Sequence, residues 1–439
     1  MRWQTWATVL VLGSAAISAA EDWPQWLGPN QAAEWTETGL IESIPEAGLP
    51  VRWRVPVALG YSGPAVAAGK VYVFDYVKTS GEIQNNPGAR TKLAGSERLQ
   101  CFNTQDGSLM WKHEYDAPYE VSYAAGPRTT PTVDGDHVYT LGAEGALTCL
   151  STRDGSVVWK KDLKAVYGVP SPLWGFSASP VVNGDQLYLL VGGQEHAVVA
   201  LNKLTGAEEW RSLSDTDAGY STPTLTEAGG VRQLIVWLPS AIHGLNPDNG
   251  QPYWSIDLKP SYGMTIMLPR VSGNTLFASG IGNVGAAMTL GQDMPRAEVA
   301  WRGKGNDAVY CSNSTPLIVD GVIYGCHCDT GMLTAVDLQS ARRLWETTAP
   351  TAGDIRRPRH GTAYLVKQGD RFFLFSETGD LILAKMSREK YEELGRTHII
   401  DPTNECFGRA VVWSHPAFAE QCVFARNDKE LVCVELKGK

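Results

Sequence analysis

A tryptophan recurs about every 49 residues through most of this chain, and this spacing constrains the fold more than any other feature. In four segments, 106–111, 154–159, 204–210 and 249–254, a glycine stands four residues before the tryptophan. Glycine supplies the positive φ of a tight hairpin turn, so the tryptophan lies on the strand that follows. Upstream of each unit lie a strand pair around a second turn and a third strand, as in 179–188 and 197–201. Four short strands in about 40–50 residues are typical of a propeller blade.

Eight anchor positions follow this period, with leucine in place of tryptophan at the last one. They are Trp53, Trp111, Trp159, Trp210, Trp254, Trp301, Trp345 and Leu394. The segment 51–57 has no three strands before it, and 430–436 is a third strand with no fourth after it. We therefore predict an all-β, eight-bladed propeller of four-stranded antiparallel blades over residues 51–439, closed by the N-terminal strand joining the last blade. We interpret the tryptophans as wedges between neighbouring blades, with a sugar-stacking track as the alternative.

The first 20 residues have the pattern of a secretory signal peptide. Arg2 is followed by an apolar run over 7–17 and by small residues up to Ala20, after which we predict cleavage. The alternative is a buried N-terminal helix. The run is too short for a permanent membrane span, and no later segment is long and apolar enough to be one. The first cysteine is Cys101, so we predict no lipoprotein anchor, a periplasmic or secreted location, and an N-terminal extension over 21–50.

Composition narrows the possible partners. A content of 43% hydrophobic and 19% charged residues excludes a disordered or coiled-coil chain. Lys and Arg total 38 against 47 Asp and Glu, for a net charge of −9, which argues against nucleic acid as a partner. We expect a monomer without a membrane span.

These motifs resemble the PQQ-like (pyrroloquinoline-quinone-like) repeat β-propeller family over about residues 22–437. Besides the repeated units, the resemblance rests on segments 22–26, 60–66, 174–180 and 218–223. The chain resembles the exported, enzyme-unassigned branch of the family, and is similar in architecture to the propeller lipoprotein of the outer-membrane β-barrel assembly machinery. The family includes quinoprotein dehydrogenases, assembly factors and binding proteins, so the resemblance implies the fold and leaves the activity open.

The chain departs from the enzymes of that family. Quinoprotein alcohol dehydrogenases typically hold the quinone against a disulfide between adjacent cysteines, whereas the nearest match here is Cys326-His327-Cys328. The haem-binding pattern C-x-x-C-H is also absent from the sequence. The residues indicate no cofactor, and the resemblance leaves PQQ with calcium open. We predict no metal site at 326–328, because alternation along a strand would place His327 opposite the two cysteines.

The other cysteines give no firm pairing. Cys101, Cys149 and Cys433 occupy equivalent third-strand positions, which predicts a core role. Pairing of Cys422 with Cys433, or of Cys311 with Cys406, stays open.

The longest connections fall on one face of the predicted ring. We expect 78–98 to be a loop between the second and third strands of the first blade, and 164–173, 350–358 and 401–406 to connect successive blades. All four emerge on the same face, and loops on one end of a rigid scaffold usually carry the function. We therefore predict a site at the mouth of the central channel on this loop-rich face.

Candidate ligand-binding residues stand where the chain enters the blades on this face. They are Arg128, Trp174, Tyr220, Asn313, Arg359, His360 and Arg409. Converging arginines would bind carboxylates or phosphates, whereas in the alternative each arginine pairs with a nearby acidic residue or carbonyl. For Arg356 and Arg357 a solvated role is equally well supported. We interpret His360 as a hydrogen-bonded channel histidine, with an acid–base role as the alternative, and the Ser414-His415 pair as structural.

We therefore predict an exported propeller that holds a protein segment or an anionic ligand at its loop-rich face and performs no chemistry of its own. One alternative is a compact PQQ-dependent dehydrogenase oxidising an alcohol or sugar, whose catalytic residues the sequence does not identify. A second is a carbohydrate-binding propeller that uses Tyr61, Trp174 and Tyr220.

Overall fold

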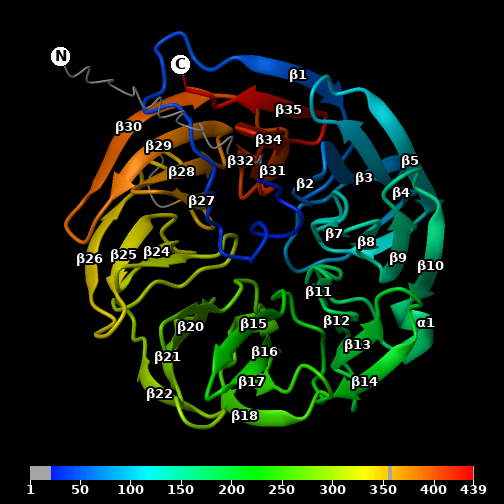
Figure 1. The fold of residues 1–439 in the computed structure, drawn as a ribbon, viewed down its shortest axis with the longest axis vertical. Helices are drawn as coiled ribbons and strands as arrows, with labels where there is room; N and C mark the ends of the chain where they lie inside the picture. Colours follow the sequence, from blue (N-terminus) through cyan, green and yellow to red (C-terminus); the bar gives the residue numbers. More distant parts are fainter. Residues whose placement is uncertain (1–20, 354–357, 439) are drawn as a thin grey trace, which may run out of the picture.

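The computed structural model describes residues 21–353 and 358–438, and these residues form a ring of eight antiparallel blades around a central channel (Figure 1). The first four blades comprise β2 (Ala65–Ala67), β3 (Lys70–Ser80), β4 (Thr91–Asn103) and β5 (Leu109–Asp116); β7 (Thr132–Asp134), β8 (His137–Leu141), β9 (Ala146–Ser151) and β10 (Val157–Asp162); β11 (Val181–Asn183), β12 (Gln186–Leu190), β13 (Val198–Asn202) and β14 (Glu208–Ser212); β15 (Thr224–Ala228), β16 (Val231–Trp237), β17 (Ala241–Leu245) and β18 (Pro252–Asp257). The last four comprise β19 (Arg270–Ser272), β20 (Thr275–Gly280), β21 (Val284–Leu290) and β22 (Ala297–Arg302); β23 (Leu317–Val319), β24 (Val322–Cys326), β25 (Leu333–Asp337) and β26 (Arg343–Thr347); β27 (Ala363–Gln368), β28 (Arg371–Ser376), β29 (Asp380–Met386) and β30 (Tyr391–His398); β33 (Ala417–Ala419), β34 (Cys422–Arg426), β35 (Glu430–Glu435) and β1 (Val51–Pro56). Short elements lie between them: β6 (Tyr119–Val121), α1 (Leu163–Tyr167), the 3-10 turn η1 (Ser261–Gly263), and the hairpin of β31 (Asn404–Cys406) and β32 (Arg409–Val411).

Strand β1 closes the ring as the sequence predicts. It pairs antiparallel with β35, so that Trp53 lies opposite Cys433 and Val55 opposite Leu431. The eighth blade therefore takes three strands from the C-terminal end of the chain and its outermost strand from the N-terminal part.

The repeated tryptophans lie between blades, which confirms their interpretation as wedges. The Trp111 indole Nε1 donates to the Thr152 carbonyl of the next blade at 3.1 Å. A Cβ atom built on Gly155 would lie 2.5 Å from the Trp111 ring, so only glycine fits this turn. The same contact joins Trp53 to Gly107, Trp159 to Gly206, and Trp210 to Gly250. Cys101 and Cys149 lie directly opposite Trp111 and Trp159 and are fully buried, which confirms their core role.

The first blade corrects one prediction. Residues 78–98 are not one loop, because β3 continues to Ser80 and β4 begins at Thr91. Burial alternates along the start of β4, and β6 pairs with it there. Leu93, Tyr119 and Tyr76 form a separate apolar cluster that stabilises these longer strands. The connection itself is therefore confined to residues 81–90.

The N-terminal extension crosses the central channel and hydrogen-bonds to blades on different sides of it (Figure 1). Trp23 exchanges two backbone hydrogen bonds with Val66 of the first blade. Arg270 of the fifth blade donates to the Gln31 and Ala32 carbonyls at 2.6 and 2.7 Å. Further backbone hydrogen bonds reach the seventh and eighth blades. The extension thus links the first, fifth, seventh and eighth blades across the channel.

Within the part of the chain that the structure describes, no helix is long and apolar enough to cross a membrane. The predicted signal peptide concerns residues 1–20, which lie outside the described residues.

Candidate functional site

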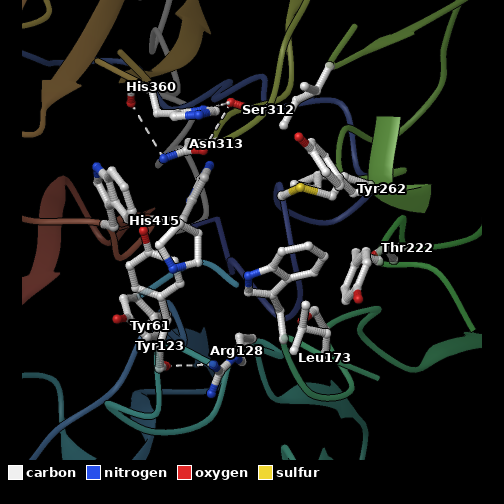
Figure 2. Close-up of a pocket in the computed structure, with 18 of the residues that line it drawn as sticks. Tyr61, Tyr123, Arg128, Leu173, Thr222, Tyr262, Ser312, Asn313, His360 and His415 are labelled. Atoms are coloured by element: carbon white, nitrogen blue, oxygen red, sulfur yellow. Dashed lines mark hydrogen bonds between the residues drawn. The ribbon is translucent and has the colours of Figure 1, made fainter. Parts of the chain in front are cut away.

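A cavity of about 500 Å³ occupies the mouth of the channel on the loop-rich face (Figure 2). A four-residue motif, written x-Ser/Thr-x-Pro in its commonest form, leads into the innermost strand of each blade. The first residue of this motif lines the cavity in every blade. In order around the ring these residues are Tyr61, Arg128, Ser177, Tyr220, Ile266, Asn313, His360 and Trp413. Trp26 of the N-terminal extension also lines the cavity.

The structure brings six of the seven predicted site residues together on this cavity. They are Arg128, Trp174, Tyr220, Asn313, Arg359 and His360. Their role in binding stays a prediction. Figure 2 shows His360, Asn313 and Ser312 on one side of the hollow and Arg128 with Leu173 on the other.

Arg409 is the exception. Its guanidinium donates to both carboxylate oxygens of Glu377, at 2.7 and 3.2 Å, and it does not line the cavity. The Glu377 carboxylate also accepts from Trp413 Nε1 at 3.0 Å and from the Thr362 amide at 3.2 Å. The alternative interpretation, pairing with an acidic residue, therefore holds for Arg409. Arg356 and Arg357 lie outside the described residues.

Arg128 differs from Arg409 in its partners. Its guanidinium donates to the carbonyls of Ser122 and Tyr123 at 2.7 and 2.6 Å, and to that of Gly126. It also lies over the Tyr61 ring, 5.3 Å from the centroid. Among the described residues no carboxylate oxygen lies within salt-bridge distance of it. Burial lowers the pKa of Arg128, because a buried cation loses its hydration.

The carboxylate of the nearby Glu97 is already hydrogen-bonded to groups other than Arg128. Its buried carboxylate accepts from the hydroxyls of Tyr115 and Tyr119 and from the Ala143 amide at 2.8 Å. Because these donors engage both oxygens, Glu97 acts on Arg128 only through space. Burial raises the pKa of Glu97. The Arg128 charge therefore faces the cavity without a directly bonded counter-ion among the residues described.

His360 is hydrogen-bonded, as its preferred interpretation predicts. Its Nδ1 lies 2.8 Å from Ser312 Oγ, and Asn313 Nδ2 donates to its carbonyl at 3.4 Å. The ring stacks on Phe407 at 4.9 Å between centroids. Burial lowers the pKa of His360 to about 4, so the imidazole is neutral near pH 7. The exposed guanidinium of Arg359 lies over the same Phe407 ring at 5.9 Å.

The structure places His415, which the sequence analysis interpreted as structural, on the wall of the cavity. His415 is the third residue of the motif in the eighth blade and lines the cavity. Burial lowers its pKa to about 4. Alignment of the motif from blade to blade is the signal that finds it, because Thr222 and Ser179 hold the same position and also line the cavity.

The segment after β24 corrects a second expectation. The strand ends at Cys326, so alternation no longer separates the next residues, and ligand atoms of His327, Cys328 and Asp329 lie within 4.8 Å of one another. His327 Nδ1 already accepts from the Asp329 amide at 3.1 Å. Burial lowers the pKa of His327 to about 4 and raises that of Cys328 to about 12. A protonated thiol and an engaged imidazole make a weak ligand set for a metal.

All eight cysteines lie within the described residues and are buried free thiols. Cys422 lies opposite Glu435 and Cys433 opposite Phe424, so the two cysteines are not cross-strand partners. Neither pairing left open by the sequence is formed in this structure.

The cavity lining can be compared with what a calcium-held quinone needs. Calcium takes six to eight oxygen ligands, largely carboxylates. The described lining residues include no carboxylate and no cysteine. This donor set does not fit PQQ with calcium.

The sequence matches the family model described as outer membrane protein assembly factor BamB over residues 95–293 and 230–437. No curated protein matches it. Among solved structures, BamB from Moraxella catarrhalis is similar at 16% identity, covering 84% of this chain and 99% of that one with a TM-score of 0.53. A europium-containing methanol dehydrogenase has a TM-score of 0.58 at 11% sequence identity, and the match covers 94% of this chain and 89% of that one. The quinohemoprotein alcohol dehydrogenase from Comamonas testosteroni has a TM-score of 0.58 at 11% sequence identity, and the match covers 95% of this chain and 81% of that one. At these identities the solved structures show a shared fold alone.

Proposed function

The chain belongs to the family described as outer membrane protein assembly factor BamB, and from that premise we propose that it is an exported propeller binding an anionic small molecule in the cavity at its loop-rich mouth. The propeller performs no chemistry of its own. It supplies a rigid ring on which eight side chains of seven kinds converge.

The observation that carries this proposal is Arg128. A cation held by neutral carbonyls in a partly buried position is costly unless an anion compensates it. Arg409, with its bonded Glu377, needs no such ligand. A carboxylate bound against Arg128 would supply the missing counter-ion through charge-assisted hydrogen bonds.

The rest of the wall favours a ligand with a flat, apolar body. Tyr220 and Trp174 meet edge to face at 5.6 Å, and Met264, Ile266 and Ile281 add apolar surface. A cavity of about 500 Å³ lies within the range of small-molecule sites, roughly 300–1,000 Å³. Tyr262 is 81% exposed at the rim, and Arg359 supplies a second cation there.

Calorimetric titration with benzoate, 2-naphthoate and 2,6-naphthalenedicarboxylate tests the proposal, with 2-naphthalenemethanol as the neutral match. We expect saturable binding of at least one carboxylate, and weakening of about tenfold or more in Arg128→Met, since hydrogen bonds to charged groups contribute about 1.5–3 kcal/mol. Arg153→Met, on the 86% exposed Arg153 side chain, is the control and should bind normally. Equal affinity for the alcohol, or no binding of any carboxylate, would contradict an anion site.

A PQQ-dependent dehydrogenase is the second candidate, because two solved structures of similar fold are alcohol dehydrogenases. The cavity lining argues against it, as described above. Titration with PQQ, with and without calcium, followed by dye-linked oxidation of alcohols and sugars, decides between the two. Calcium-dependent binding at micromolar affinity with turnover would place the enzyme first.

A further inference from the structure

The third position of the blade motif is occupied by a small or apolar residue in seven blades. These residues are Gly63, Thr130, Ser179, Thr222, Leu268, Thr315 and Thr362. Three of their hydroxyl oxygens accept a hydrogen bond from a backbone amide of the preceding blade. The Ser179 hydroxyl accepts from the Thr130 amide at 3.1 Å, that of Thr222 from the Ser179 amide at 3.0 Å, and that of Thr315 from the Leu268 amide at 3.1 Å. The eighth blade places His415 at this position instead. The imidazole is thus a large polar group at a position where the other blades have smaller or apolar residues, three of which tie neighbouring blades together.

Hydrogen bonding fixes the tautomer of His415. Its Nδ1 lies 2.6 Å from the Pro416 carbonyl oxygen. A carbonyl oxygen only accepts, so Nδ1 carries the proton and donates it. Because the ring is neutral at ordinary pH, Nε2 is left as a bare acceptor.

No group among the described residues donates to this acceptor. His415 Nε2 is buried and has no hydrogen-bond partner there. The ring is enclosed by aromatic side chains, at 4.8 Å from Trp26, 5.1 Å from Tyr364 and 6.4 Å from Trp23 between centroids. Trp26 and Tyr364 line the cavity with it, and Figure 2 places His415 on the cavity wall between His360 and Arg128. A buried acceptor without a donor is costly, and native structures rarely keep one unused.

We infer that His415 Nε2 accepts a hydrogen bond from the ligand, so that the bound molecule is a hydroxylated aromatic carboxylate. This inference rests on the proposed function and deepens it. Arg128 selects for the carboxylate, and His415 selects for a neutral donor on the aromatic body. A cationic donor is disfavoured, because Arg128 and Arg359 already make the cavity positive. A site built around an acceptor discriminates strongly against analogues that lack the donor, because the acceptor then stays unpaired.

The test compares 2-naphthoate with its 3-, 6- and 7-hydroxy derivatives and with the matching methoxy compounds. We expect one hydroxy isomer to bind about tenfold or more tightly than 2-naphthoate, and its methoxy match to lose that gain. His415→Phe should remove the gain, so that the hydroxy isomer binds no more tightly than 2-naphthoate. His113→Phe is the matched control, because His113 lies on the outer strand β5 and does not line the cavity, and it should keep the preference for the hydroxyl.

A second measurement does not depend on the variants folding. In the unaltered protein with ¹⁵N-labelled histidine, the unprotonated Nε2 resonance of His415 should shift upfield when the preferred hydroxy isomer binds, and not when 2-naphthoate binds. If 2-naphthoate binds but no hydroxyl improves affinity, the role of His415 is wrong and the anion site stands. If none of these carboxylates binds, both the anion site and the role of His415 are wrong. If the hydroxy isomer still binds more tightly than 2-naphthoate in His415→Phe, another group accepts the hydrogen bond from its hydroxyl and the inference is overturned.

Discussion

The outer strands of the propeller repeat one contact from blade to blade, whereas the mouth of its channel shows a different side chain in almost every blade. Trp111 against Gly155 is the same contact as Trp159 against Gly206. At the mouth, the equivalent motif positions hold Arg128, Asn313 and Trp413. Repetition therefore marks the positions that hold the ring together, and departure from repetition marks the positions free to build a site.

Removing one wedge should have the largest effect on stability. Trp111→Ala opens a cavity between the first two blades and should lower the free energy of unfolding by about 3–5 kcal/mol. Trp174→Ala, at the mouth, should cost far less stability while weakening ligand binding. Urea unfolding of the two variants, followed by calorimetric titration, checks this. Equal destabilisation by both would remove the distinction between ring and mouth.

The turn glycines offer a sharper test of the same contact. In Gly155→Ala the new methyl group meets the Trp111 ring, while in Gly135→Ala nothing lies within 4 Å of it. Both positions have positive φ, so both substitutions introduce the same kind of backbone strain. The overpacking adds about 1–3 kcal/mol in Gly155→Ala alone. Thermal and urea unfolding measure the difference, and equal losses would show that the wedge tolerates the extra volume.

Stability should fall as pH decreases from about 6.5 towards 4. Burial lowers the pKa of His243, His327, His360 and His415 to about 4, so in this window the unfolded chain takes up protons that the folded chain does not. His398 acts in the opposite sense. Two carboxylates 2.9 Å away raise its pKa despite partial burial, so its contribution is present below about 6.5 and is lost as pH rises through the folded-state pKa. Melting temperatures across pH 4–8 check both signs. His398→Gln should lose a constant contribution below about pH 6.5, while the decline towards pH 4 keeps its slope and the two proteins converge as pH rises through the folded-state pKa.

The smallest effect is expected on the solvent side of the outer strands. Val158 is next to the wedge Trp159 in sequence but 44% exposed, so Val158→Thr should change the free energy of unfolding by less than about 0.5 kcal/mol. A larger loss, measured by urea unfolding, would mean that this edge packs against something beyond the described residues.

The period of the tryptophans sufficed to predict the blade number and the closing strand, because each wedge is a local sequence signal. The arrangement of side chains at the mouth of the channel was harder to predict. Arg128 is the first residue of its blade motif, whereas Arg409 stands four residues before Trp413, which holds that position in the eighth blade. Only Arg409 meets a carboxylate, and that carboxylate belongs to Glu377, 32 positions away. Nothing in the sequence indicates that Nε2 of His415 lacks a hydrogen-bond partner. Sequence spacing indicates which blade supplies a side chain, whereas hydrogen-bond satisfaction depends on the neighbouring blades.

Closure by β1 has a consequence for how the chain reaches this structure. Val55 pairs with Leu431, so the last contact of the ring joins positions separated by almost the entire sequence. Such a contact carries a high loop-closure entropy and cannot form until the C-terminal strand has emerged. During synthesis the first blades can assemble in order, but β1 must wait unpaired for β35. We therefore expect the final step of folding to be slow and concerted, with deletion of the last strand leaving two exposed sheet edges prone to association.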